Sequence, residues 1–350
     1  MKGNGDQSTN LKRVVVTGGS GFVGKALCRA LHRAGFDVLS ISRRAVLDLE
    51  HEGIRSYRCD LTAEGLPLAE LLAGVHAVFH TAAHVEMWGA YDDFFRANVF
   101  ATRQLLDACE RAGCPYFIFT SSPSVVAGDQ DLRGVDESIP YPTRYRAWYP
   151  ETKATAEKEV RARGVSGVVK TLSLRPHLIF GPGDTNLIPT ILDRARKGRL
   201  PIIGRGTNLV DVSYIDDCVA AHLCALEALE SDPSLSGEAF FISQGEPVGL
   251  WAFIDEVLSR AGIARLTRRV DARIAFGIAA VVEGISRLLP SHPEPPLTTF
   301  LVKEMSTDHY FDISRARARL GYTPRFSVIR ALEETFRGEV EHSAERRGPC

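Results

Sequence analysis

A tyrosine and a lysine four residues apart are the side chains of this sequence best suited to proton transfer. In a helix Tyr149 and Lys153 share one face. An ordinary tyrosine has a pKa of about 10, which a nearby ammonium lowers because it stabilises the phenolate. Tyr149 is then a candidate general acid or base near neutral pH. Pro150 follows it, which predicts that the helix begins at about Pro150 and leaves the Tyr–Lys geometry open.

A cluster of hydroxyl side chains lies upstream of this pair. The segment Thr120–Ser124 (TSSPS) follows YFIFT, a run typical of a buried strand. A hydroxyl at the carboxyl end of a parallel strand can orient a substrate oxygen, although serines are also common in ordinary loops. YxxxK motifs also occur by chance, so the order of glycine-rich turn, serine cluster and YxxxK is more specific than any one of them.

A glycine-rich turn near the N-terminus is typical of a dinucleotide phosphate site. The strand-like run Arg13–Thr17 leads into TGGSGFVG, whose glycines have the spacing GxxGxxG. Such glycines allow a tight turn, close approach of the backbone to a pyrophosphate, and close packing of the helix on the strand. The first N–H groups of the helix then face the anion. The predicted phosphate-binding residues are Gly18, Gly21, Phe22, Val23 and Gly24.

The end of the second predicted strand indicates which dinucleotide binds. Strands that bind NAD usually end in Asp or Glu, whose carboxylate accepts the ribose hydroxyls. Here residues 37–42 lead to Ser42, Arg43 and Arg44, with no acidic residue before Asp48. An arginine pairs with a 2′-phosphate, which a carboxylate would repel. We therefore expect NADP(H) to be favoured over NAD(H), with Ser42 and Arg43 as binding residues; simply solvated arginines are the alternative.

Two further strand ends complete the predicted cofactor site. Asp60 and Leu61 follow a weaker strand (RSYRC), and a carboxylate there can accept a hydrogen bond from the adenine amino group. Ala82 and Ala83 follow the next predicted strand (AVFH), where small side chains leave room for the cofactor. Both positions lie at the carboxyl edge of the sheet, where doubly wound folds bind ligands.

Short β-rich runs alternate with amphipathic segments through the first half of the chain. This alternation predicts an α/β fold, a Rossmann-type doubly wound parallel sheet with helices on both faces. Beyond residue 183 the sequence indicates a smaller helix-rich C-terminal substrate lobe. We expect a flexible N-terminus, an NAD(P)-binding Rossmann domain, a substrate-binding lobe and a flexible tail, at residues 1–10, 11–183, 184–340 and 341–350.

Composition and charge argue against several classes of protein. The 350 residues include 42 Lys+Arg and 43 Asp+Glu, a net charge of −1 that disfavours a nucleic-acid binder. A hydrophobic content of 45 % disfavours disorder. We find no secretory signal and no apolar run suited to spanning a membrane. Seven scattered cysteines without CxxC, and histidines without ligand spacing, predict reduced thiols in the cytoplasm and no metal site.

Together these motifs resemble the extended short-chain dehydrogenase/reductase superfamily over about residues 12–338. The resemblance is carried by TGGSGFVG, the serine cluster, YPETK and RPHLIFGP, and is closest to the 3β-hydroxysteroid dehydrogenase/isomerase branch. RPHLIFGPGD, NLVDVSYIDD and AFFISQGEP resemble sterol-4-carboxylate 3-dehydrogenases (decarboxylating). HVEMWGAYDDF, ISRRAVLDL and MSTDHYFDISRARARLGY are more similar to the 2-alkyl-3-oxoalkanoate reductases of long-chain olefin synthesis.

The resemblance implies roles for individual residues and a reaction. By motif, Tyr149 is the general acid/base, and Lys153 is its partner and contacts the nicotinamide ribose. Ser122 matches the catalytic hydroxyl, with the neighbouring serines as alternatives. Pro176 is implied to contact the cofactor. The implied enzyme is an NAD(P)-dependent oxidoreductase that interconverts a 3-hydroxyl and a 3-ketone on a bulky hydrophobic substrate.

The sequence is compatible with several substrates and with one non-catalytic role. A 3β-hydroxysteroid or sterol-4-carboxylate, with loss of CO₂ from the β-keto acid as in sterol C-4 demethylation, is the first expectation. Reduction of a 2-alkyl-3-oxoalkanoate is the alternative, followed by a nucleotide-sugar epimerase or dehydratase. A non-catalytic dinucleotide sensor is the rival from another class, which the retained Ser122, Tyr149 and Lys153 disfavour.

Residues 272–289 (ARIAFGIAAVVEGISRLL) are the most apolar segment of the expected lobe. Their three charged side chains disfavour a membrane span. An apolar helix with a basic flank, here Arg265, Arg268 and Arg269, can lie in a membrane interface, although a core or lid helix over the substrate is the favoured alternative. We expect a cytoplasmic protein with membrane association left open, and the resemblance implies a homodimer.

Overall fold

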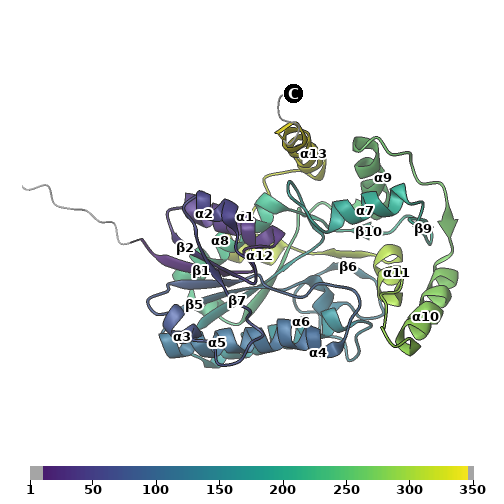
Figure 1. Cartoon of the computed structure of the whole chain (residues 1–350). Helices are drawn as coiled ribbons and strands as arrows, with labels where there is room; N and C mark the ends of the chain where they lie inside the picture. The colour runs from purple at the N-terminus through teal and green to yellow at the C-terminus, as the bar shows by residue number, and fades with distance from the viewer. Residues whose placement is uncertain (1–10, 346–350) are drawn as a thin grey trace, which may run out of the picture.

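The computed structural model describes residues 11–345 and has a central parallel sheet between two layers of helices (Figure 1). Seven strands, all paired in parallel, follow the order β12-β7-β5-β4-β1-β2-β3. Their bounds are β1 (Arg13–Thr17), β2 (Asp37–Ser42), β3 (Arg55–Arg58), β4 (Ala77–His80), β5 (Tyr116–Thr120), β7 (Lys170–Pro176) and β12 (Glu238–Ile242). The predicted Rossmann-type α/β fold is confirmed. The predicted flexible residues 1–10 and the end of the predicted tail, 346–350, lie outside the described residues.

Helices cover both faces of this sheet, which explains why its central strands are apolar throughout. On one face lie α1 (Phe22–Arg33), α2 (Leu47–His51) and α8 (Ile215–Ser231) (Figure 1). On the other lie α3 (Leu68–Leu71), α5 (Ala101–Ala112) and α6 (Trp148–Ser166). The valines of β1 and the Phe-Ile-Phe run of β5 are completely buried, as in strands covered on both sides.

The sheet receives elements from both sides of the boundary predicted at residue 183. Strand β12 pairs with β7 at the edge of the sheet, and α8 packs against α1. Both come from the segment expected to form the substrate lobe. Strand β12 joins the sheet because its run Ala239–Ile242 is apolar. This run is wholly buried between the helices that also flank the other strands.

The second lobe combines short strands with helices at the carboxyl side of the sheet (Figure 1). A four-stranded sheet has the order β13-β10-β15-β6. The strands of the lobe are β6 (Leu132–Val135), β8 (Ile179–Phe180), β9 (Ile202–Ile203), β10 (Leu209–Val210), β11 (Ser213–Tyr214), β13 (Val248–Gly249), β14 (Arg269–Val270) and β15 (His309–Phe311). Its helices are α7 (Leu187–Arg196), α9 (Leu250–Arg260), α10 (Ala272–Leu288), α11 (Thr299–Ser306), α12 (Ser314–Leu320) and α13 (Val328–Glu345).

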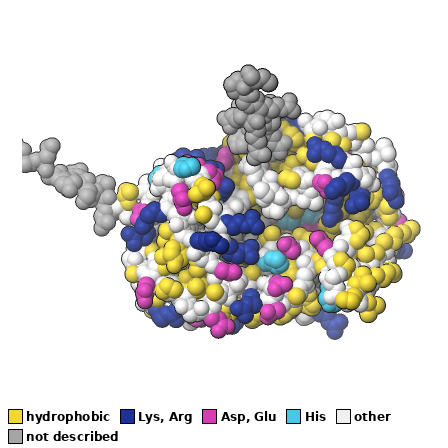
Figure 2. Space-filling model, viewed as in Figure 1, with side chains coloured by type: hydrophobic (Ala, Val, Ile, Leu, Met, Phe, Trp, Pro, Cys, Tyr) yellow, Lys and Arg dark blue, Asp and Glu magenta, His cyan; other side chains and the backbone are white. Residues whose placement is uncertain are grey.

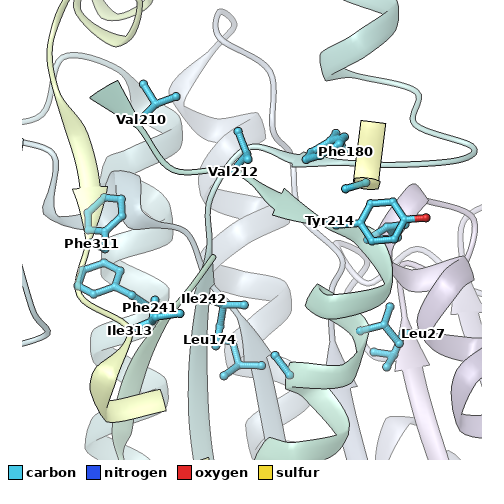
Figure 3. Packing of buried hydrophobic residues seen from close by; sticks show 14 of the residues in the cluster. Leu27, Leu174, Phe180, Val210, Val212, Tyr214, Phe241, Ile242, Phe311 and Ile313 are labelled. Carbon is cyan, nitrogen blue, oxygen red and sulfur yellow. The ribbon is translucent and has the colours of Figure 1, made fainter. Parts of the chain in front are cut away.

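One hydrophobic core runs through both lobes. Leu174 of β7 and Ile242 of β12 belong to the same buried cluster as Val210 of β10 (Figure 3). Phe241 of the large sheet stacks on Phe311 of the small one, with ring centroids 4.3 Å apart. The lobes are therefore joined by packing as well as by the chain. Among residues 11–345, none of the helices has the length and apolar character needed to cross a membrane.

Candidate functional site

The glycine-rich turn between β1 and α1 forms a tight cradle in which two positions require glycine. Gly18 has a φ of +75°, and a Cβ there would lie 2.8 Å from the backbone nitrogen of Ala82. A Cβ on Gly24 would lie 2.2 Å from the carbonyl oxygen of Gly18, so α1 packs directly on the turn. Gly19, which we did not assign from the sequence, packs against β2, because a Cβ there would lie 2.0 Å from Ser40 Oγ.

The first turn of α1 is open to an anion. Gly21 is its N-cap and supplies no side-chain hydrogen bond, so the N–H groups of Phe22 and Val23 have no capping partner. N–H groups without a side-chain cap, at the positive end of the helix dipole and beside a glycine-rich turn, fit a dinucleotide pyrophosphate. The residues present are therefore compatible with the cofactor predicted for this turn.

The end of β2 presents an arginine and no free carboxylate. Arg43 is exposed and makes no ion pair within residues 11–345, while the Ser42 side chain is buried beside it. Asp48, the nearest acidic residue along the chain, is held by Lys25 at 3.0 Å and Arg29 at 3.1 Å, both on α1. This arrangement leaves the strand end positively charged.

The ends of β3 and β4 flank the same cradle. Asp60 Oδ1 accepts hydrogen bonds from the Thr62 N–H at 3.0 Å and hydroxyl at 2.8 Å. These bonds, the backbone one first, hold the pKa of Asp60 below its ordinary value. Leu61 is buried, and the half-buried Ala82 packs its backbone against the turn, next to Ala83. The contact of Asp60 with an adenine amino group stays a prediction.

Tyr149 and Lys153 lie on the same helix, which settles the geometry that the sequence left open. Helix α6 begins at Trp148, so the predicted start at Pro150 is wrong by two residues. Pro150 is the third helical residue, and its missing N–H costs nothing because the first four N–H groups of a helix have no partner within it. The four-residue spacing therefore places both side chains on one face of α6.

The side chain of Lys153 extends from α6 and is buried against the end of β5. Its ammonium donates a hydrogen bond of 2.7 Å to the Thr120 carbonyl oxygen and lies 4.1 Å from the centroid of the Phe119 ring. Burial lowers the pKa of Lys153 to about 7, and the negative charge of Glu157 partly opposes this effect. The lysine is thus held where a small change in its surroundings alters its protonation.

Tyr149 is half-buried, and Ser122 is the serine of the cluster that influences its hydroxyl. Burial raises the pKa of Tyr149, and hydrogen bonding to the Ser122 hydroxyl partly opposes the increase. Ser122 Oγ also accepts a hydrogen bond of 3.2 Å from the Ser124 N–H. The hydroxyls of Ser121 and Ser124 are buried and have no protein partner within residues 11–345. A bound nicotinamide cation would favour the phenolate.

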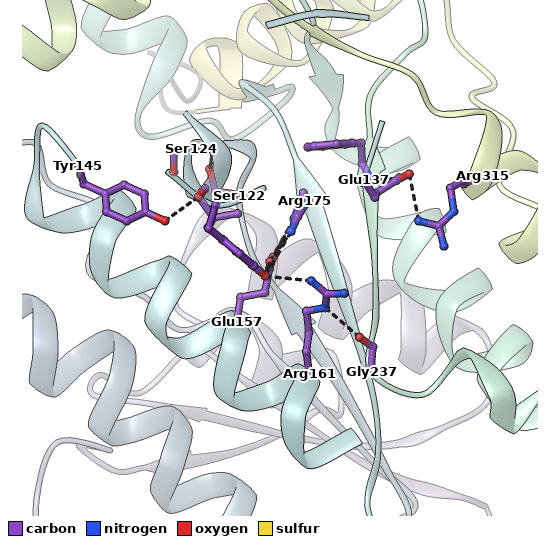
Figure 4. Close-up of polar contacts among 12 residues, drawn as sticks. Ser122, Ser124, Glu137, Tyr145, Glu157, Arg161, Arg175, Gly237 and Arg315 are labelled. Carbon is purple, nitrogen blue, oxygen red and sulfur yellow. Dashed lines mark hydrogen bonds and ion pairs between the residues drawn. The ribbon is translucent and has the colours of Figure 1, made fainter. Parts of the chain in front are cut away.

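A buried ion pair, which sequence reasoning missed, lies one turn below Lys153 (Figure 4). Arg175 of β7 donates to both carboxylate oxygens of Glu157, at 2.6 and 2.9 Å, and both side chains are almost completely buried. Tyr141 donates a further hydrogen bond of 2.5 Å to Glu157. The spacing Lys153–Glu157 was the only sequence signal for this pair, because the arginine comes from a distant strand.

Asn98 is a second buried group that the sequence did not indicate. It lies in the π-helix η1 (Phe95–Phe100). Its side chain accepts from the His84 N–H at 2.7 Å and donates to the Thr152 hydroxyl at 3.0 Å. Thr152 precedes Lys153, so Asn98 ties α6 to the end of β4. Single π-turns of this kind are frequent at functional sites.

A hollow beside the serine cluster is lined from both lobes and includes Ser124 and a pair of histidines. His177 follows Pro176 at the end of β7, and its Nε2 lies 2.6 Å from Nδ1 of His309. With Glu304, the three side chains have ligand atoms within 4.8 Å, a group that sequence spacing did not predict. Two nitrogens bound to one zinc in tetrahedral geometry lie roughly 3.3 Å apart. The shorter distance indicates a hydrogen bond between the two rings. Burial lowers the pKa of His177, which keeps its imidazole neutral.

Comparison with known proteins places this chain among dehydrogenases and reductases. Residues 15–270 match the 3-beta hydroxysteroid dehydrogenase/isomerase family. The chain is 39 % identical to a 2-alkyl-3-oxoalkanoate reductase of Stenotrophomonas maltophilia, over 91 % of this chain and 97 % of that protein. It is 35 % identical to a 3 beta-hydroxysteroid dehydrogenase/Delta 5-->4-isomerase of Mycobacterium tuberculosis, over 95 % and 91 % of the two chains.

Two further comparisons concern a sterol enzyme and the fold. A mouse sterol-4-alpha-carboxylate 3-dehydrogenase, decarboxylating, is 32 % identical over 93 % of this chain and 90 % of its own. The UDP-glucuronic acid 4-epimerase of Bacillus cereus, solved in complex with NAD, superposes with a TM-score of 0.73. At 22 % identity, and with 94 % of this chain and 99 % of that one covered, this likeness concerns the fold alone.

Proposed function

Because the chain belongs to the 3-beta hydroxysteroid dehydrogenase/isomerase family, we propose that it interconverts a 3-oxo and a 3-hydroxy group on a bulky hydrophobic acid. The chain is an oxidoreductase of this family. The observation that carries the proposal is the placement of Tyr149 and Lys153 on one face of α6, beside Ser122 and the carboxyl end of β5. That edge also carries the glycine cradle for the dinucleotide.

The favoured substrate is a 2-alkyl-3-oxoalkanoate, which was the alternative in the sequence analysis. The bacterial reductase is more similar to this chain than the sterol dehydrogenase, at 39 % against 32 % identity. Both names describe an oxygen on C3, β to a carboxylate, on a large apolar body. A 4-carboxysterol is therefore the second candidate, and its 3-keto product is a β-keto acid that can lose CO₂.

Tyr149 and its neighbours account for the proton side of this reaction. When bound, the reduced nicotinamide supplies the two electrons and the hydrogen that arrive at C3. Tyr149 Oη then gives its proton to the C3 oxygen, and in the oxidative direction it takes that proton back. The Lys153 ammonium stabilises the resulting phenolate, and Ser122 orients the oxygen.

The Tyr149→Phe variant tests this assignment. It retains the ring but lacks the proton, so we expect turnover to fall by about 10²–10³-fold while the dinucleotide dissociation constant stays within about twofold. Turnover with NADPH and NADH is measured on 2-alkyl-3-oxo acids, 4-carboxysterols and UDP-sugars side by side. Near-normal turnover of the variant would overturn the role of Tyr149, and a preference for UDP-sugars would overturn the substrate class.

We further propose that the cofactor is NADP(H). Support comes from the exposed Arg43 and from Asp48, which is engaged by two basic residues. In the Arg43→Glu variant a carboxylate replaces the partner of the 2′-phosphate, so KM for NADPH should rise at least tenfold and KM for NADH should not. Arg44→Glu is the matched control. A wild-type enzyme that uses NADH better than NADPH would contradict the proposal.

A further inference from the structure

Helix α10 presents its large aliphatic side chains to solvent. Five of them, spaced three or four residues apart, are between 51 and 86 % exposed: Ile274, Ile278, Val281, Ile285 and Leu288. The face turned toward the protein instead carries small or polar side chains: Ala275, Ala279, Glu283 and Ser286. A helix on the surface of a water-soluble protein normally has the opposite arrangement.

The buried face is held in this orientation by specific contacts. Glu283 accepts hydrogen bonds from the Thr299 N–H at 2.6 Å and hydroxyl at 3.1 Å, at the start of α11. The acidic residue in the middle of the apolar segment therefore points inward. The outward stripe from Ile274 to Leu288 carries no acidic side chain.

The apolar surface extends toward the start of α6. The Trp88 indole donates a hydrogen bond of 2.9 Å to the His292 carbonyl oxygen, and the Arg287 guanidinium lies 5.5 Å from the Trp88 ring. Tyr91, which is 41 % exposed, packs edge-on against Trp148 with ring centroids 5.3 Å apart. Trp148 immediately precedes the candidate catalytic tyrosine.

Arginines border this surface. Those near α10 are all exposed: Arg265, Arg268, Arg269, Arg273 and Arg287. Arg268 and Arg273 make no ion pair within residues 11–345. Figure 2 shows hydrophobic side chains along the edge of the molecule where α10 lies in Figure 1, with basic side chains above them.

We propose that α10, together with Trp88 and Tyr91, forms a lipid-binding surface that rests on an anionic bilayer. The helix lies in the plane of the interface, with its aliphatic stripe among the acyl chains and the arginines on the headgroup phosphates. A second copy of the chain is disfavoured, because a two-fold contact through this stripe would bring the two sets of arginines together. If the proposed function holds, the same bilayer dissolves the substrate near the entrance to its site.

Vesicle co-sedimentation of the full chain tests this surface without any catalytic turnover. Vesicles of phosphatidylcholine alone are compared with vesicles in which one third of the lipid is phosphatidylglycerol. We expect binding to the anionic vesicles only. The variant Ile278→Ser/Val281→Ser/Ile285→Ser should reduce the partition coefficient at least tenfold, because it removes the inserted apolar area. Arg268→Gln/Arg273→Gln should reduce it severalfold and lower its salt dependence.

The matched control changes three aliphatic side chains of similar exposure away from α10: Val165→Ser/Val168→Ser/Ile329→Ser. Circular dichroism confirms that each variant is folded. Equal binding by the α10 variant and this control would overturn the proposal, as would failure of the wild type to bind anionic vesicles. A change in oligomeric state caused only by the α10 variant, without vesicle binding, would assign the stripe to a protein contact. None of these results depends on whether the enzyme turns over a 3-oxo acid.

Discussion

At the scale of single residues, Lys153 shows how the surroundings adapt an ordinary side chain to this site. Its ammonium is buried, donates one hydrogen bond to the Thr120 carbonyl, and has a pKa lowered to about 7 by burial. An exposed lysine would stay charged throughout the neutral range. Here protonation changes close to physiological pH, so the group that we propose stabilises the Tyr149 phenolate responds to pH and to any bound cation.

The lowered pKa of Lys153 predicts a specific pH dependence of stability. Below pH 7 the lysine is charged in both the folded and unfolded states, so the folded protein bears the full cost of the buried charge. Between pH 7 and about 10 the unfolded state binds more protons, so this cost falls as pH rises. The free energy of unfolding of Lys153→Met, minus that of the wild type, should therefore decrease between pH 6 and pH 9 in urea titrations. A constant difference would show that the lysine is not affected by burial.

At the scale of elements, the position of α6 explains the site. The helix begins at Trp148, contacts the π-helix η1 through Asn98 and Thr152, and is joined to β7 by the Glu157–Arg175 ion pair. Each contact lies within one turn of Lys153. The helix is thereby fixed relative to the carboxyl ends of β4, β5 and β7, where a dinucleotide and a substrate would meet.

Breaking the buried pair from one side should be more damaging than removing it. Arg175→Met leaves the Glu157 carboxylate buried without its ion pair, so we expect a loss of about 3–5 kcal/mol in the free energy of unfolding. Arg175→Met/Glu157→Gln removes the charge as well and should be less destabilised than the single variant. Urea denaturation of both variants measures the difference. A double variant as unstable as the single one would contradict this explanation.

At the scale of the whole molecule, the two lobes depend on each other. Strand β12 and helix α8 follow residue 183 in the sequence and yet complete the nucleotide-binding sheet. The aromatic stack of Phe241 on Phe311 continues the core into the small sheet. The hollow beside Ser124 is lined by residues from both parts, so it forms only when the two parts are folded together.

A chain that ends at residue 183 tests this dependence. It lacks β12 and α8, which leaves the apolar face of β7 and α1 uncovered, so it should not unfold cooperatively on heating. Production of residues 184–350 in the same cells should restore a soluble complex. A cooperative thermal transition of residues 1–183 alone would show that the predicted boundary separates independent domains.

The sequence alone determined most of the sheet and the chemical groups at its edge. Four strands match the predictions: Arg13–Thr17, Asp37–Ser42, Ala77–His80 and Tyr116–Thr120. Short apolar runs between turns can be predicted as buried strands because they rarely adopt another secondary structure in a doubly wound fold. The turn of Gly18 and Gly24 could be predicted for the same reason, since steric limits on a tight turn are local.

Only the tertiary structure decided which distant groups meet and which face of a helix is covered. The Arg175–Glu157 and His177–His309 pairs join residues from separate elements, and no local spacing encodes such contacts. The large aliphatic side chains of α10 lie on one face, and the sequence pattern alone would predict that this face is buried. In the folded protein Glu283 instead faces inward and accepts hydrogen bonds from Thr299, which leaves the aliphatic stripe exposed, because a buried carboxylate requires a hydrogen-bond donor and an isoleucine does not.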